Sequence, residues 1–187
     1  MKLLLYCTKA KPYLLRNVKG QWLIDNIHKI ASKNGKIIAE CDFEVEKITC
    51  RRIGGEWESY GEYTNFIELS KKSMLTQQEL CDYLSRNAGG YAIHIKNLHI
   101  FDKPKELNDF YKFVGIDKDT NNYKSIEKAP QNMMYAYEYI SEISFSATWT
   151  RMLNGCIIIS IRPKWLVKIL NGEKTIEVRK KVLKEML

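Results

Sequence analysis

Residues 158–180, IISIRPKWLVKILNGEKTIEVRK, carry the clearest structural pattern of the chain. An apolar run over residues 156–161 predicts a buried strand, and Pro163 suits the first helical position because that position needs no backbone donor. One helical face follows, formed by Trp165, Leu166, Ile169 and Leu170. Gly172 is expected to end the helix, and residues 175–179 return to the two-residue period of a strand. The sequence therefore predicts a strand–helix–strand unit near its C-terminal end.

An amphipathic strand is predicted nearer the N-terminus, over residues 36–48 (KIIAECDFEVEKI). Alternate positions of this stretch are apolar, and the positions between them include Glu40, Asp42, Glu44 and Glu46. Such a two-residue period is typical of an antiparallel strand with one buried face. Before it, apolar residues at helical spacing predict a short helix over 21–33, stopped by Asn34-Gly35.

Three further elements are predicted in the middle of the chain. The pattern T-Q-Q-E is a capping box and predicts a helix over 77–86. Residues 91–101 predict a long strand, closed by Pro104, and residues 133–140 predict another. The second of these strands places three aromatic side chains on one face: Tyr135, Tyr137 and Tyr139. The polar segment 117–127 is expected to be a loop.

This order of elements favours the α+β class. A length of 187 residues suits one compact domain, and 45% hydrophobic residues are enough to form a core. We therefore expect a small, mostly antiparallel β-barrel with three or four short helices.

The positive charge is concentrated at the two ends of the chain. Thirty Lys and Arg against 22 Asp and Glu give a net charge of +8. Residues 1–36 carry +7, residues 37–155 carry −4 and residues 156–187 carry +5. A basic protein favours polyanionic partners such as nucleic acid, and the two ends would form one field only if they folded against each other.

The sequence predicts a cytoplasmic protein without a metal or a cofactor. Its apolar opening is too short for a signal peptide or a membrane span. Its five cysteines are widely spaced and predict buried, reduced thiols rather than disulfides or a zinc site. His94 and His99 fall on opposite faces of their strand by parity, and His28 has no partner at helical spacing, so no metal site is expected.

The stretch GEKTIEVR, Gly172 to Arg179, fits the GxKxxExR signature of ASCH domains at every fixed position. These domains are small barrels of the PUA-like superfamily, which is associated with RNA. The stretches LLYCTKAKPYL, NGKIIAECDFEVEKI, GGYAIHIKNLHIFDKPKEL and KAPQNMMYAY also resemble this family, so the resemblance covers most of the chain.

The order of the segments is reversed relative to the family, in which the signature precedes the YCTKAKP-like strand. The chain therefore resembles a circularly permuted ASCH domain of phage or mobile-element type. The resemblance implies one domain over 1–187, in which residues 156–180 complete a barrel begun by residues 1–140 and residues 141–155 form the connector. A monomer and a domain-swapped dimer both satisfy this arrangement.

Permutation would join the two basic ends into a face of about +12, which suits a phosphate backbone. The resemblance implies a module that binds nucleic acid, RNA or a modified base in RNA above all, through a basic cleft. Thr175, Glu177 and Arg179 alternate onto one face of the predicted strand. Arg179 suits a bidentate grip on phosphate, and Glu177 can accept from a base or hold Arg179 or Lys174.

Lys9 and Lys11 follow the neighbouring strand of the permuted arrangement and are expected to extend the nucleic-acid-binding cleft. Without the resemblance, solvated lysines and a surface ion pair between Glu177 and Arg179 explain the same residues.

An enzyme acting on RNA is the second expected function. One branch of the family removes the acetyl group of N4-acetylcytidine with the signature Lys and a Thr nucleophile. Here the Lys is Lys174, but Glu177 stands at the Thr position, and a carboxylate does not replace a hydroxyl in acyl transfer. A ribonuclease, as in a second branch, would use Lys174 and Glu177 as catalytic residues and Arg179 to bind phosphate.

A third expected function is that of a phage accessory protein. A compact basic protein of this kind could inhibit a host nuclease that works with a guide nucleic acid, as anti-CRISPR proteins do, or bind the host ribonucleoprotein itself.

Overall fold

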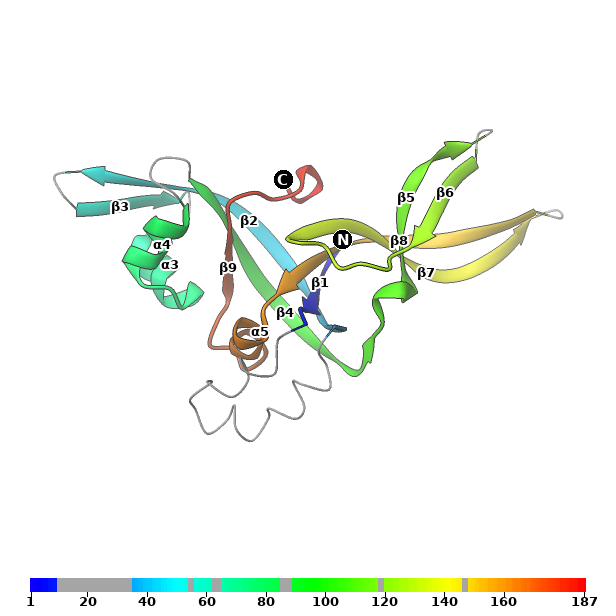
Figure 1. The fold of residues 1–187 in the computed structure, drawn as a ribbon, viewed down its shortest axis with the longest axis horizontal. Helices are drawn as coiled ribbons and strands as arrows, with labels where there is room; N and C mark the ends of the chain where they lie inside the picture. Colours follow the sequence, from blue (N-terminus) through cyan, green and yellow to red (C-terminus); the bar gives the residue numbers. More distant parts are fainter. Residues whose placement is uncertain (10–34, 54–55, 62–64, 85–88, 118–119, 146–147) are drawn as a thin grey trace. The chain divides into compact units, whose positions relative to one another are not determined.

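The structure is a computed structural model of the chain, and it describes residues 1–9, 35–53, 56–61, 65–84, 89–117, 120–145 and 148–187 (Figure 1). These residues form two compact units. The first contains Met1–Cys41 and His99–Val167, and the second contains Asp42–Leu98 and Lys168–Leu187. Both units are rich in strands and the chain includes helices, so the predicted α+β class is confirmed.

The first unit is a sheet in which β1 lies between β8 and β2, and its strand order is β6-β5-β7-β8-β1-β2. The pairing of β1 with β8 is parallel, from Lys2 opposite Cys156 to Cys7 opposite Ile161. The other pairs are antiparallel, and β7 and β8 form a long hairpin (Figure 1). The strands are β1 (Lys2–Cys7), β2 (Ile37–Ile53), β5 (Phe110–Asp117), β6 (Thr120–Ser125), β7 (Met133–Phe145) and β8 (Thr148–Ile161), with a short 3-10 helix at Leu107–Asp109.

The second unit combines strands with two helices. Its elements are the end of β2, β3 (Glu56–Gly61), α3 (Phe66–Ser73), α4 (Gln77–Leu84), the start of β4 (Gly90–Lys105), the end of α5 (Pro163–Leu170), β9 (Ile176–Arg179) and a 3-10 helix at Lys184–Met186. β4 lies between β2 and β9, and β3 pairs with β2. In neither unit do the described strands close into a ring, so the barrel stays a prediction.

Each unit has its own apolar core, because alternate residues of the strands point to one face. One apolar cluster of the first unit consists of Leu4, Tyr6, Ile37, Leu107, Phe110, Ile126, Ala136, Cys156 and Ile158. On the other face of β1 and β8, Leu3, Leu5, Ile157 and Ile159 are also fully buried. The core of the second unit lies between the strands and helices α3 and α4, and consists of Ile48, Leu69, Leu80, Cys81, Leu84, Ala92, Ile176 and Val178. Burial of each large aliphatic side chain stabilises these cores by about 1.5–3 kcal/mol.

The helix with the capping box begins as the sequence predicts. The Thr76 N–H donates to a carboxylate oxygen of Glu79 at 2.8 Å, and the Glu79 N–H donates to the Thr76 hydroxyl at 3.2 Å. The strands expected over 36–48 and 133–140 are also present and extend further than predicted. The helix expected over 21–33 lies outside the described residues.

Two segments that we expected to be irregular are strands. Residues 117–127 contain β6, which pairs with β5, and residues 141–145 and 148–155 form the facing ends of β7 and β8. Their polar composition gives a weak strand signal because cross-strand partners, rather than intrinsic propensity, stabilise them. β4 also continues past Pro104, which a strand tolerates where the proline nitrogen faces no hydrogen-bonding partner.

The cysteines that the structure describes with their side chains agree with the prediction of reduced, buried thiols. These residues are Cys7, Cys41, Cys81 and Cys156. Burial raises the pKa of Cys7 to about 11 and the pKa of Cys156 to about 12, so both thiols are protonated at neutral pH.

Candidate functional site

The signature residues lie in the second unit, where the chain leaves α5 and enters β9. Gly172 has a φ of +78°, a left-handed conformation that favours glycine, and its N–H donates to the Ile169 carbonyl at 3.0 Å. The Lys174 N–H donates to the Lys168 carbonyl at 2.9 Å. These two bonds satisfy carbonyls at the end of α5 and turn the backbone directly into the strand.

The strand β9 presents its signature side chains on one face. It pairs antiparallel with β4, so that Glu177 lies opposite Ile93 and Arg179 lies opposite Tyr91. The side chains between them, Ile176 and Val178, are buried in the core of the second unit. Glu177 and Arg179 therefore alternate with core residues, as the sequence predicts for a strand.

The side chain of Lys174 is buried, with 3% of its surface exposed. Its Nζ donates to the carbonyl oxygen of Ser73 at 2.7 Å and to that of Ile176 at 2.8 Å. It also lies 3.3 Å from Oε2 of Glu177. Ser73 is the last residue of α3, where carbonyls have no partner within the helix. The ammonium group therefore joins the C-terminal end of α3 to β9.

Burial lowers the pKa of Lys174, and the neighbouring carboxylate of Glu177 opposes this shift. An ammonium group has three N–H donors, and the three oxygens around Nζ can accept all of them. Lys174 is thus suited to stabilise the fold in its charged form, since losing the proton would leave one oxygen without a donor.

Glu177 connects the two cations of the signature. Its Oε1 accepts from Nη2 of Arg179 at 2.9 Å, while Oε2 faces Lys174. The side chains of Glu177 and Arg179 are 12% and 14% exposed, so this ion-pair network is largely withdrawn from solvent. Removing one member of such a network leaves a buried charge without compensation.

The backbone of Thr175 forms hydrogen bonds with two neighbouring elements, α3 and β4. Its N–H donates to the carbonyl of Lys72 in α3 at 3.1 Å, and its carbonyl accepts from the N–H of Ile95 in β4 at 2.9 Å. This residue supplies the hydroxyl nearest in sequence to Lys174, one position after it. The ion-pair network of Lys174, Glu177 and Arg179 itself contains no hydroxyl group.

The structure brings together three of the six predicted site residues: Lys174, Glu177 and Arg179. Thr175 adjoins them in the chain, while Lys9 belongs to the first unit and is exposed there. Lys11 lies outside the described residues.

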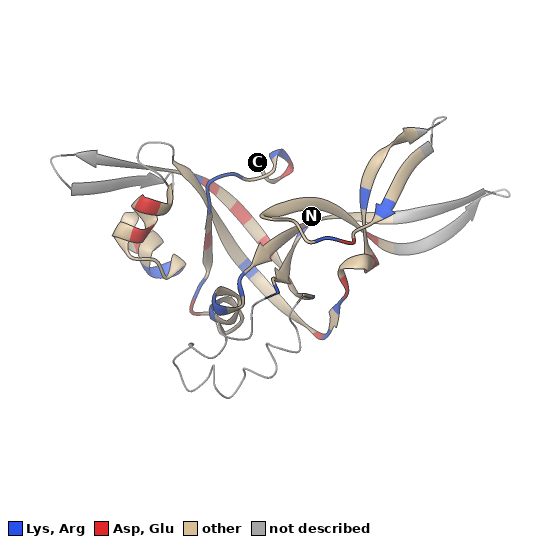
Figure 2. Ribbon diagram, in the orientation of Figure 1, with Lys and Arg blue, Asp and Glu red and all other residues tan. Residues whose placement is uncertain are grey.

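A second group of cations lies in the first unit at the end of the parallel pair β1–β8, where Lys9 was predicted but Arg162 and Lys164 were missed. The Thr8 N–H donates to the Ile161 carbonyl at 3.0 Å, so the residues that follow β1 and those that follow β8 begin next to each other. Lys9 follows one strand, and Arg162 and Lys164 follow the other. All three side chains are exposed, and we call this group the basic edge. Figure 2 shows in blue the Lys and Arg positions that the structure describes.

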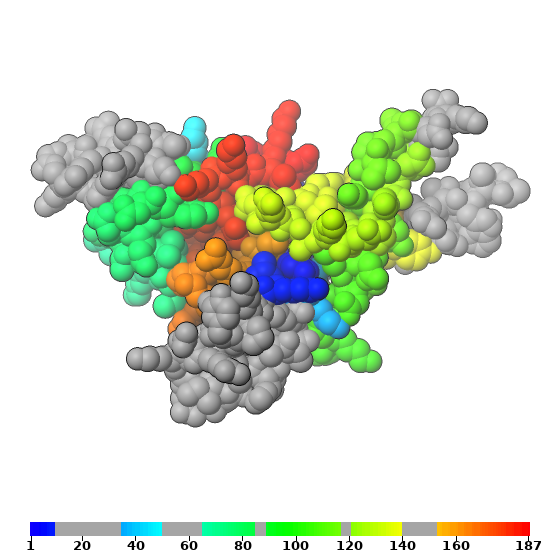
Figure 3. All heavy atoms as spheres, viewed as in Figure 1, coloured from blue at the N-terminus to red at the C-terminus, as the bar shows by residue number. Residues whose placement is uncertain are grey.

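The backbone of the basic edge is well defined. The carbonyl of Arg162 accepts from the N–H groups of Trp165 and Leu166, at 2.9 and 3.0 Å, and so starts α5. The ammonium group of Lys164 lies 4.7 Å from the ring of Trp165. The Lys9 side chain lies over Gly35, where an added Cβ would come within 2.9 Å of its Cε. In Figure 3, blue atoms of the N-terminal segment lie beside orange atoms of the chain that follows β8.

The acidic face predicted on β2 is paired with β4. Within the second unit, Glu46 lies 2.9 Å from Nε2 of His94, and Glu44 lies 2.5 Å from Nζ of Lys96. Asp42 accepts from the side-chain amide of Asn97 at 2.8 Å. Polar residues of β4 therefore compensate the carboxylates of this face.

The predicted placement of the two histidines on opposite faces is wrong. His94 meets Glu46, and His99 lies 3.6 Å from Glu40, a carboxylate on the same face of β2. Asn97, which lies between them in sequence, has a φ of +49°. We interpret it as a β-bulge, in which one extra residue moves the side chains that follow to the other face of the strand. Each histidine faces its own carboxylate, and the described residues contain no cluster suited to a metal ion.

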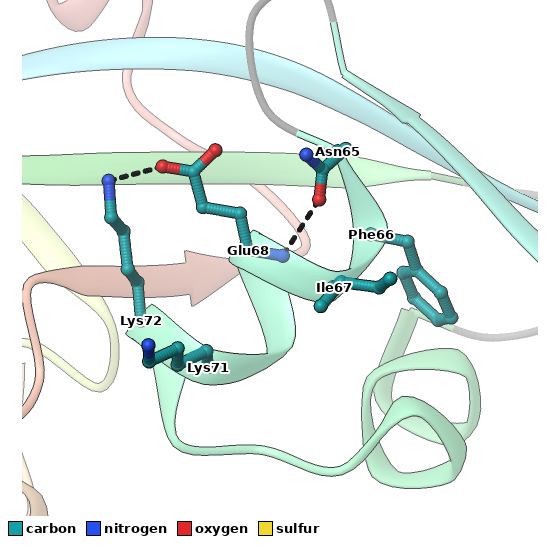
Figure 4. Close-up of a pocket in the computed structure, with 6 residues that line it drawn as sticks. All are labelled: Asn65, Phe66, Ile67, Glu68, Lys71 and Lys72. Carbon is teal, nitrogen blue, oxygen red and sulfur yellow. Dashed lines mark hydrogen bonds and ion pairs between the residues drawn. The ribbon is translucent and has the colours of Figure 1, made fainter.

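A hollow of about 650 Å³ lies along the start of α3 (Figure 4). It is lined by Asn65, Phe66, Ile67, Glu68, Lys71 and Lys72, all from one stretch of chain. Asn65 caps the helix by accepting from the Glu68 N–H at 2.9 Å, and Glu68 pairs with Lys72 at 2.5 Å. The polar side chains of this hollow thus serve the helix itself.

Comparisons of the chain with protein-family models, curated proteins and solved structures found no match. In the part of the chain that the structure describes, no helix has the length and apolar character needed to cross a bilayer.

Proposed function

We propose that this protein binds nucleic acid, RNA above all, and that the basic edge contacts the phosphate backbone. The observation that carries the proposal is the parallel pairing of β1 with β8, which places Lys9 beside Arg162 and Lys164. One cation of the N-terminal basic segment and two of the C-terminal one therefore lie at the same edge of the first unit. Three exposed cations at one edge suit a polyanion better than an uncharged ligand.

The start of α5 adds to the attraction for anions. The helix dipole places partial positive charge at this end of α5. Arg162 stands at this end of the helix and Lys164 lies in its first turn. A phosphate at this point would meet the side-chain cations together with the partial positive charge of the helix end.

We propose further that the fold is a permuted ASCH-like barrel. The strand–helix–strand order of β8, α5 and β9, the left-handed Gly172 and the GxKxxExR residues all agree with the family pattern. In this proposal Lys174 and Glu177 are positioning residues, since their contacts hold α3, β9 and Arg179 together.

A salt titration tests the proposed function. Binding of a fluorescent 12-nucleotide RNA and of the matching DNA is measured by anisotropy between 50 and 300 mM salt, for the wild type and for Arg162→Gln/Lys164→Gln. We expect affinity to fall with salt, and the double variant to lower the slope of log K against log salt by about 1.4, or about 0.7 per lost phosphate contact. Lys71→Gln, an exposed lysine on α3, is the matched control.

Two results would contradict the proposal. Absence of binding at 50 mM salt would remove nucleic acid as the ligand. An unchanged slope in Arg162→Gln/Lys164→Gln, together with wild-type affinity, would show that the phosphate contacts lie elsewhere.

A further inference from the structure

Four aromatic side chains form a continuous row across three strands of the first unit, which we call the aromatic ladder. Phe113 on β5 lies opposite Tyr123 on β6, with ring centroids 5.9 Å apart. Tyr123 approaches Tyr137 on β7 at 4.9 Å, and Tyr137 approaches Tyr135 at 5.1 Å. The ladder therefore runs from the hairpin β5–β6 onto β7.

The aromatic ladder lies on the face of these strands that points away from their core. Ala136, which lies between Tyr135 and Tyr137 in sequence, is fully buried in the first unit, so both tyrosines point to the opposite face. Phe113, by contrast, is 46% exposed, and Ile116 beyond it is 68% exposed. An outward sheet face is ordinarily polar. A contiguous apolar patch in its place indicates a surface for interaction.

The ring geometry leaves aromatic faces available. The contacts are edge-to-face, with interplanar angles of 66°, 74° and 81° along the ladder. In such a contact one ring uses its edge, so its own faces are not covered by that neighbour. At the inner end an added Cβ on Gly155 would lie 2.2 Å from the Tyr135 hydroxyl, so this glycine leaves room for that hydroxyl.

The hairpin that carries the outer half of the ladder also carries two lysines directly opposite each other. Lys112 on β5 and Lys124 on β6 are a cross-strand pair, and both are exposed. Neither has an ion-pair partner among the residues that the structure describes. Like charges at such positions destabilise a hairpin, and an anion bound between them would remove that cost.

The edge strand β6 brings the two features next to each other. Tyr123 and Lys124 are consecutive, so they point to opposite faces of a two-stranded ribbon. β6 is the first strand in the order of the first unit, so one of its sides has no neighbouring strand among the described residues. A flexible polymer that runs along β6 can place flat groups against the aromatic side chains on one face of the hairpin and anionic groups against the lysines on the other face.

We propose that the hairpin β5–β6 binds single-stranded nucleic acid, with bases stacked on Phe113 and Tyr123 and phosphates held by Lys112 and Lys124. This inference rests on the proposed function and adds a second contact surface to the basic edge. Bases of any sequence have a face to stack, so the site is suited to unpaired strands without strong sequence preference. The lysine pair and the net charge of +8 favour this polyanion over a protein partner.

The test compares a normal oligonucleotide with one that lacks bases. Anisotropy is measured for a 12-nucleotide single-stranded DNA, for an abasic strand of the same length and for the matching duplex. Phe113→Ala should weaken binding of the normal strand about 10-fold and leave the abasic strand unchanged, since stacking on one ring is lost. Phe113→Tyr should restore wild-type binding. Lys112→Gln/Lys124→Gln should weaken both strands and lower the salt slope by about 1.4.

Controls separate the possible failures. Ile67→Ala/Lys71→Gln removes an exposed apolar side chain and an exposed lysine from α3, and should bind like the wild type. If the wild type binds no strand, both this inference and the proposed function fail. If it binds but Phe113→Ala matches the control, only this inference fails. Self-association that Phe113→Ala abolishes, with strand binding unchanged, would also overturn it in favour of a protein interface.

Discussion

Lys174 and Lys9 carry the same charge, but Lys174 is buried and Lys9 is exposed. The ammonium group of Lys174 lies in the second unit among two carbonyl oxygens and a carboxylate, with almost none of its surface exposed. Lys9 lies in the first unit at the end of β1, exposed and close to two other exposed cations, Arg162 and Lys164. The lysine of the sequence signature therefore stabilises the fold, whereas residues outside the signature supply accessible positive charge.

The largest expected effect comes from removing the buried lysine. Lys174→Met should lower the free energy of unfolding by about 3–5 kcal/mol, because Glu177 and the carbonyl of Ser73 would lose a charged partner in a buried site. Urea denaturation measures the change. A loss below about 1 kcal/mol would mean that the ammonium group contributes little to the fold, and would restore Lys174 as a candidate ligand contact.

A double variant sharpens this test. In Lys174→Met/Glu177→Gln the carboxylate loses its charge together with its partner. The two losses should be less than additive by about 1 kcal/mol or more if the residues interact as the structure describes. Full additivity would contradict the contact.

The second expected effect is alkaline destabilisation of the first unit. Burial raises the pKa of Cys7 to about 11 and that of Cys156 to about 12. The unfolded thiols ionise near pH 8.5–9, so the folded state binds more protons above that pH and the free energy of unfolding falls as pH rises. Between pH 8 and 10 the loss should be about 2–3 kcal/mol. Cys7→Ala/Cys156→Ala should flatten this dependence, and an equal slope in this variant would contradict the assignment.

Lys174 should have the opposite effect on the pH dependence of the free energy of unfolding. Its folded-state pKa is lowered by burial, so the unfolded state binds more protons between that value and its ordinary pKa. The stability of the wild type relative to Lys174→Met should therefore rise with pH below about 10.4. A difference that does not change with pH would argue against the burial of this charge.

A smaller effect is expected from the cap of α4. Thr76→Ala removes a side chain that accepts from the Glu79 N–H, and should lower the free energy of unfolding by about 1 kcal/mol. Thr76→Ser keeps the hydroxyl and is the matched control, with an expected change within about 0.5 kcal/mol. Equal losses in the two variants would show that the hydroxyl does not cap the helix.

The smallest effect should come from an exposed lysine that pairs within one helix. Lys72→Gln breaks an ion pair with Glu68, and both side chains are 40% or more exposed. The expected loss is about 0.3–0.5 kcal/mol, since solvent screens such pairs. A loss comparable to that of Lys174→Met would erase the difference between buried and exposed lysines on which this account rests.

Local patterns predicted the elements that carry their own signals. The capping box placed α4, Pro163 and Gly172 bounded α5, and the strict alternation of residues 36–48 placed β2. In each case the pattern is set by bonds or periods that span only a few residues.

Two elements that depend on distant partners were missed. α3 is short and polar, and β6 is held by its pairing with β5. The acceptor of Lys174 at Ser73 lies 101 residues away in sequence, so no spacing rule can identify it. The side-by-side placement of the first strand and the C-terminal strand was expected, but only from the family resemblance, because no local pattern specifies a pairing between opposite ends of the chain.

Photocrosslinking provides the most direct test of the central claim that the two basic ends of the chain meet the same nucleic acid. A 12-nucleotide RNA containing 4-thiouridine is irradiated with the wild-type protein, and crosslinked peptides are identified by mass spectrometry. We expect crosslinks both to the peptide that contains Lys9 and to the peptide around Arg162 and Lys164, lost together in 500 mM salt. Crosslinks confined to other surfaces, or to only one of these two peptides, would contradict the account.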